Sequence, residues 1–201
     1  MTGQLKHVFF RPSVGKHCGG PAFGVPVMIL GESHYSEEEP DRDLTRKVVL
    51  QTIRGECDFA FFRNSATAFL GDHGDPRMPR FWESVIFYNY VQCLVDKEKR
   101  PTRKMWVDAE LPFLEVLAMV EPSPRLVVVL GRDTWENTPC CGRDVRSIRS
   151  EGEEIPCYEF CIRGRAVLAP KLPHASRGFS PSRWRPVILE ALKRVAGHEF
   201  R

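Results

Sequence analysis

Three polar side chains in this sequence, Glu32, Asn89 and His174, each follow an apolar run of strand length. A carboxylate can stabilise a positive charge or deprotonate water, and an imidazole can donate to a leaving group. An amide both donates and accepts hydrogen bonds, which suits the reading of a heterocyclic base. Together the three groups suit a reaction in which one side of the breaking bond becomes positive and the other becomes negative.

The elements that must position these residues are four apolar runs, at 25–30, 84–88, 126–130 and 166–170. Segments with helical spacing alternate with them, at 41–53, 111–120 and, after a proline, 187–196. Strands that alternate with helices predict an α/β fold with a mostly parallel sheet. Ligands bind beyond the carboxyl ends of such strands, where the strand order reverses, so we expect the three side chains to meet in one cleft.

The length of 201 residues, 42% of them apolar, suits one compact domain that spans residues 1–201. We therefore expect a single domain with a central, mostly parallel, four-stranded sheet flanked by helices. The pattern is least readable over 136–164, where a hairpin or an insertion fits.

The net charge is only +3, but the basic residues cluster towards the carboxyl end of the chain. Eight lysines and arginines fall between Arg163 and Arg194, against one acidic residue, Glu190. Such a surface suits a polyanionic partner such as DNA. The acidic runs at 37–39 and 151–154 could equally balance it, and both interpretations stay open.

The seven cysteines are odd in number and lack the paired spacing of a metal site. This pattern predicts free thiols in a reducing cytoplasm and no bound metal. Residues 1–16 lack the apolar core of a secretory signal, and no run approaches the ~20 apolar residues of a membrane span. We expect a cytoplasmic protein that does not enter a membrane.

The polar loops also form an ordered set of short motifs. In chain order they are Gly31-Glu32-Ser33-His34-Tyr35, then Asn89, then Leu130-Gly131 with Trp135, and finally His174-Ala175-Ser176-Arg177-Gly178-Phe179. Over roughly residues 25–195, this order resembles the uracil-DNA glycosylase superfamily. His34 and Ala175 stand where that family usually has proline. The cysteine spacing departs from the cluster pattern of the branch that carries Glu, so no iron–sulfur cluster or other cofactor is implied.

The resemblance implies a monofunctional DNA glycosylase that acts as a monomer on DNA. It would rotate a pyrimidine-type base out of the stack and hydrolyse its N-glycosidic bond. Glu32 would handle the attacking water or the sugar charge, and His174 would stabilise the departing base. Substrate contacts fall to Gly31, Ser33, His34, Tyr35 and Asn89, the last reading the base edge. The target is uracil or a modified cytosine, and the role is either repair or defence against phage DNA.

Contacts to the DNA itself are expected from the last loop and the segment after it. The residues are Ser176, Arg177, Gly178, Phe179 and Arg183. Arg177 and Phe179 are candidate wedges that would hold the gap left by the base. Phe179 also fits the pattern of a core residue.

Two other functions remain open from the sequence. Gly31-Glu32-Ser33 resembles the nucleophile loop of Gly-Asp-Ser esterases, with Ser33 as nucleophile and His174 as base. Those enzymes carry Asp three residues before the histidine, where this chain has Lys171. The second alternative is a DNA-binding module of the same fold without turnover.

Overall fold

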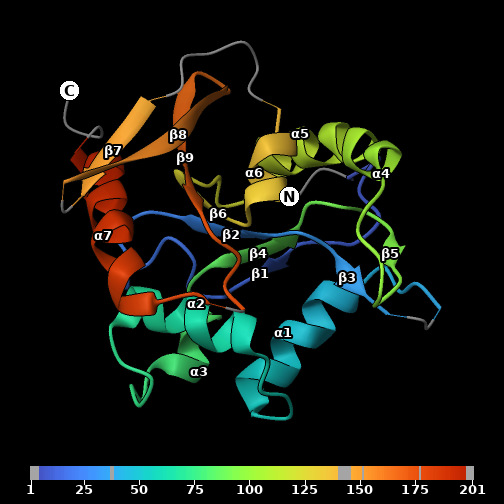
Figure 1. The fold of residues 1–201 in the computed structure, drawn as a ribbon, viewed down its shortest axis with the longest axis horizontal. Coiled ribbons are helices and arrows are strands. Elements are labelled where there is room, and N and C mark those ends of the chain that lie inside the picture. The colour runs from blue at the N-terminus through green and yellow to red at the C-terminus, as the bar shows by residue number, and fades with distance from the viewer. Residues whose placement is uncertain (1–4, 37–38, 140–145, 151, 177, 198–201) are drawn as a thin grey trace.

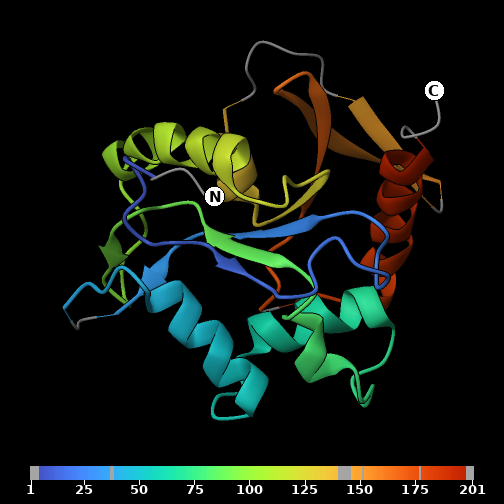
Figure 2. The same ribbon diagram turned by 180° about the vertical axis from the view of Figure 1, so that it is seen from behind.

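The computed structural model describes residues 5–36, 39–139, 146–150, 152–176 and 178–197. A central sheet crosses the molecule, with helices on both of its faces (Figures 1 and 2). Its seven strands run in the order β1-β4-β2-β6-β9-β8-β7. Within the described ranges, no helix has the length and the apolar character to cross a membrane.

The four predicted strands are parallel neighbours at the middle of this sheet, as expected. They are β2 (Val27–Gly31), β4 (Ile86–Asn89), β6 (Leu126–Leu130) and β9 (Arg165–Leu172). Every residue of β2, β4 and β6 is buried, because helices cover both faces. This double burial explains the uninterrupted apolar runs in the sequence.

The prediction of four strands was wrong, because antiparallel strands extend both edges of the sheet. β1 (Ser13–Val14) pairs with β4, β8 (Glu153–Ile162) pairs with β9, and β7 (Arg146–Ser150) pairs with β8. β1 has only two residues, and β8 alternates buried with exposed side chains, so neither has the continuous apolar pattern of a central strand. Of the hairpin and the insertion that the sequence left open for 136–164, the structure shows a hairpin, the β7–β8 pair.

Two groups of helices form the outer layers. One face carries α1 (Leu44–Arg54), α2 (Ala60–Leu70), α3 (Met78–Phe81) and α7 (Pro181–Gly197). The other face carries α4 (Arg103–Asp108), α5 (Glu110–Met119) and α6 (Arg132–Asn137). Alternate residues of β2 pack into the two cores: Val27 and Ile29 face the first group of helices, and Met28 and Leu30 face the second.

The predicted helices exist, and the largest change of boundary is at the start of the last one. α1 ends where Gly55 adopts a left-handed φ of 72°, and α5 covers the second prediction. The last helix begins at Pro181 and not after Pro186, which lies inside it. Proline is favoured at the first helical position, and Pro181 supplies that start.

Candidate active site

The strand order reverses at β2, because the chain passes from β2 to β4 on one side and then to β6 on the other. A pocket of about 360 Å³ lies here, and Glu32, Asn89 and His174 all line it. The prediction that these three residues share a cleft is therefore confirmed. The pocket volume is at the lower end of the range of ~300–1,000 Å³ typical of small-molecule sites.

The loops after β2 and β4 are held together by backbone pairing that continues past the strands. The amides of Tyr90 and Val91 donate to the carbonyl oxygens of Gly31 and Glu32, at 3.0 and 2.9 Å. Beyond them, β3 (His34–Tyr35) and β5 (Leu94–Val95) form a separate two-stranded parallel sheet. This pairing places the Glu32 loop directly beside Asn89.

Asn89 is 5% exposed and lines the pocket, opposite Gly31 in the sheet register. Within the described chain, its side-chain amide has no hydrogen-bond partner. The space for that amide exists because residue 31 has no side chain. A Cβ at Gly31 would lie 2.3 Å from the Asn89 Oδ1 atom.

For the base excision that the motif resemblance implies, we expect Gly31→Ala to displace the Asn89 amide and to lower the rate by roughly 10- to 100-fold, which corresponds to the loss of one or two hydrogen bonds to the base. The rate of base release from a modified oligonucleotide measures this effect. Gly197→Ala is the matched control, because a Cβ there meets nothing within 4 Å. Equal rates for the two variants would contradict the expectation that Asn89 reads the base.

Glu32 is 4% exposed and is bound by two groups that sequence patterns alone did not single out as a pair. Arg100 Nη2 donates to its Oε2 at 2.7 Å, and the Tyr35 hydroxyl donates to its Oε1. The same Arg100 nitrogen also donates to Asp133 Oδ2 at 2.9 Å. Glu32 is thus a buried carboxylate, and its charged partner Arg100 is largely exposed to solvent.

Tyr35 completes this wall of the pocket. Its hydroxyl donates to Glu32 and accepts from Arg100 Nη1 at 3.3 Å. Burial, and then the hydrogen bond to Glu32, raise the pKa of Tyr35 above its ordinary value. The phenol therefore stays protonated and keeps its donor role at neutral pH.

His174 follows β9 and is exposed to the pocket. Its Nδ1 lies 2.7 Å from Ser176 Oγ and 3.4 Å from the Ser176 backbone nitrogen. A backbone N–H can only donate, so Nδ1 is the acceptor and the neutral imidazole carries its proton on Nε2. Desolvation lowers the pKa of His174; Glu32 opposes this shift and Arg100 reinforces it.

The loop that carries His174 is fixed by α2. Asn64 Nδ2 donates to the carbonyl oxygens of Ala175, at 2.9 Å, and Ser176, at 3.4 Å. Ala175 itself is fully buried. Hydrogen bonds from the Asn64 side chain to these carbonyls help to hold the loop in place.

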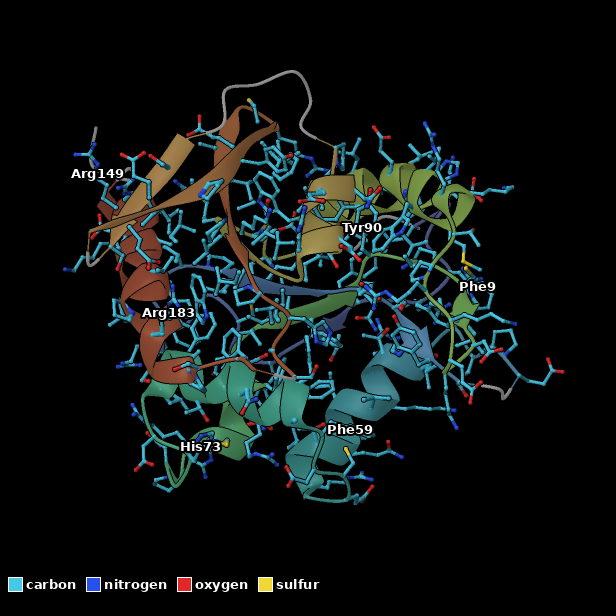
Figure 3. The ribbon with its side chains drawn as sticks, in the orientation of Figure 1. Phe9, Phe59, His73, Tyr90, Arg149 and Arg183 are labelled. Atoms are coloured by element: carbon cyan, nitrogen blue, oxygen red, sulfur yellow. The ribbon has the colours of Figure 1, made fainter. Side chains whose placement is uncertain are left out.

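Aromatic side chains form the apolar walls of the pocket. The Phe61 ring centroid lies 5.3 Å from that of His174 and 5.9 Å from that of Phe87. Phe59, which Figure 3 labels at the start of α2, is 53% exposed and also lines the pocket. An apolar wall opposite a few polar groups suits a flat heterocycle.

His34, predicted to contact substrate, is only 8% exposed although it lies at the pocket wall. Its Nε2 shares a hydrogen bond of 2.8 Å with Thr45 Oγ1 of α1, and its ring packs edge-on against Phe10. Burial lowers the pKa of His34 to about 4. These contacts tie the Glu32 loop to α1.

Because His34 is neutral when folded and titrates at its ordinary value when unfolded, the unfolded state binds the extra proton between about pH 6.5 and pH 4. Its contribution to stability is complete above that window and is lost as the pH falls through it. We expect the protonation of His34 in the unfolded state to lower the free energy of unfolding by roughly 2 kcal/mol between pH 7 and pH 5. Urea titrations of the wild type and of His34→Gln at both pH values measure it; equal losses in the two proteins would disprove the assignment.

The residues predicted to bind DNA lie in different surroundings. Ser176 lines the pocket, and Gly178 is exposed with a left-handed φ of 68°. Phe179 is 8% exposed and packs in the core, so it serves as a core residue here and not as an exposed wedge. Arg183 is on α7, where it pairs with Glu153 at 2.9 Å. Arg177 lies outside the described residues.

Ser33 lines the pocket, but no hydrogen bond joins it to His174 in the part of the chain that the structure describes.

The five cysteines in the described ranges are unpaired thiols. Among these same residues, no group of three or more His, Cys, Asp or Glu side chains is placed to hold a metal ion.

Sequence reasoning missed Arg100 and Asn64, which hold the two polar loops. Arg100 is in a linker 68 residues away from Glu32, and no local pattern joins them.

Compared with known protein families and with individual curated proteins, the chain matches neither a family model nor a curated protein sequence.

Proposed function

We propose that this protein is a DNA glycosylase that removes a uracil-like or modified pyrimidine base and leaves an abasic site. The observation that carries the proposal is the meeting of Glu32, Asn89 and His174 in one pocket at the switch point of the sheet. The motif order that resembles the uracil-DNA glycosylase superfamily supports the same chemistry.

The pocket has suitable groups for both halves of the bond that breaks. The Glu32 carboxylate would stabilise positive charge on the sugar or orient and deprotonate the attacking water. His174 Nε2–H would donate to the base oxygen as negative charge develops there. Asn89 would read the edge of the base with its unpaired amide, and Phe61 would pack near it.

The serine esterase is the weaker candidate on the same geometry. Its mechanism needs His174 to accept the proton of Ser33. Instead, the imidazole Nδ1 lies 2.7 Å from Ser176 Oγ and acts as an acceptor. The proton is then on Nε2, which makes Nε2 a donor and not a base. A module without turnover would account for the basic residues but gives no reason for a buried carboxylate at the pocket wall.

The test is an incision screen with purified protein on single-stranded and duplex oligonucleotides. The modified positions would be uracil, 5-hydroxymethylcytosine or glycosylated cytosine, with unmodified DNA as the control. We expect alkali-labile breaks at one modified base and intact unmodified strands. Intact strands across the whole series, from folded protein, would refute the proposal. The preferred base separates a repair enzyme from one that attacks modified phage DNA.

A further inference from the structure

Residues 96–104, termed the basic segment, comprise the linker between β5 and α4 and the first two residues of α4, and most of them are exposed. Five basic residues face two acidic ones within it. The basic residues are Lys97, Lys99, Arg100, Arg103 and Lys104, and all of them are exposed. Arg100 of this segment contacts both Glu32 and Tyr35, which line the pocket.

The basic segment has a defined backbone. The Glu98 amide donates to Asp96 Oδ1 at 3.1 Å, and the Lys99 amide donates to the Asp96 carbonyl oxygen at 3.0 Å. Pro101 is buried, and Thr102 then caps α4 by accepting from the Met105 amide at 3.4 Å. Lys97, Lys99 and Arg100 therefore extend from a folded turn, and Arg103 and Lys104 extend from the first turn of α4.

Much of the positive charge on the basic segment is available to a partner. Among described residues, Lys97 and Arg103 have no ion pair. Lys99 and Lys104 pair only with exposed acids of their own neighbourhood, Asp96 at 3.0 Å and Asp108 at 2.6 Å. Exposed pairs of this kind are weak, and they exchange readily for another anion.

Several of the carboxyl-terminal arginines and lysines also have partners. Arg183 binds Glu153, Lys171 binds Glu136 at 3.2 Å, and Arg185 donates to the Phe69 carbonyl oxygen. Figure 3 shows Arg183 on the α7 side of the molecule, whereas β5 and the segment after it lie on the opposite side in the same orientation (Figure 1). The basic residues of α7 and the basic segment are thus separate surfaces.

We propose that the basic segment binds the phosphate backbone of the DNA strand whose base occupies the pocket. The inference rests on the proposed function, since a base in the pocket requires its strand to pass the pocket mouth. In this arrangement Arg100 would lie at the pocket end of the bound phosphate backbone, and Lys97 and Arg103 would contact phosphates farther from the pocket. Contacts of this type position the strand without reading its sequence.

The experiment measures binding of unmodified single-stranded DNA by fluorescence anisotropy at several salt concentrations. Lys97→Ala/Arg103→Ala is compared with Arg80→Ala/Arg149→Ala. The control pair removes two exposed charges from α3 and β7, both outside the carboxyl-terminal basic cluster, and Figure 3 places Arg149 on the side away from β5. We expect the first variant to lower the slope of log affinity against log salt by about 0.7 per lost contact, and the control to keep the wild-type slope.

An unchanged slope in Lys97→Ala/Arg103→Ala, or an equal decrease in the control pair, would overturn the inference. So would binding that appears only with phosphatidylserine vesicles and not with DNA. Excision assays distinguish this failure from failure of the proposed function. If the protein excises a base but the variant keeps the wild-type salt slope and KM, the basic segment does not bind the strand, and the proposed glycosylase activity is unaffected. If the slopes change as expected but no base is released, the DNA surface stands and the glycosylase fails.

Discussion

Glu32→Gln should slow base excision by about 100-fold or more while the protein stays folded. Glutamine has the size of glutamate, and its carbonyl oxygen can still accept from Arg100 or Tyr35. What it lacks is the negative charge that would face the sugar in the transition state. Single-turnover rates on the preferred substrate measure the effect on the chemical step.

The matched control for this variant is Glu136→Gln. Glu136 is an exposed carboxylate of α6 that pairs with Arg132 and Lys171 and does not line the pocket. We expect it to keep the wild-type rate within about twofold, as for an ordinary surface change. If Glu32→Gln is as fast as Glu136→Gln, Glu32 has no part in the mechanism. If Glu32→Gln is slow, similar melting temperatures for the two variants would exclude misfolding as the cause of the lower rate.

His174→Ala should also cut the rate by about 100-fold, since it removes the donor at the base oxygen. The pH dependence carries more information than the loss itself. Burial lowers the pKa of His174 below its ordinary value, so the imidazole is neutral at pH 7 and above. The ratio of wild-type to variant rates should therefore stay level between about pH 7 and pH 9.

A ratio that rises steeply as the pH falls through that range would show that the imidazolium is the active form, contrary to this assignment. His73→Ala is the control, because His73 is exposed on the loop between α2 and α3, bonds to Thr67 and does not line the pocket (Figure 3). Its rate should match the wild type at each pH.

The central strands and the meeting of the three polar residues could be predicted because local patterns encode them. Strands buried on both faces leave continuous apolar runs, and the carboxyl ends of parallel strands necessarily share an edge. The edge strands gave no such signal. β1 is too short, and one face of β8 is exposed over much of its length.

The electrostatic surroundings of the pocket could not be predicted in the same way. Arg100 reaches Glu32 only because β3 pairs with β5, a contact of two residues on each side. The burial of Phe179 and His34 likewise depends on which helix packs over each loop. Such contacts join residues far apart in the chain, and residue type alone does not reveal them.

The backbone pairing behind the Glu32 loop has a further consequence. The amide protons of Tyr90, Val91 and Ser36 are all engaged with carbonyl oxygens of neighbouring segments. They should exchange with deuterium slowly even when no nucleotide is bound. The pocket would then be preorganised: its groups would already hold their positions in the free protein, and little ordering entropy would be lost when a base enters.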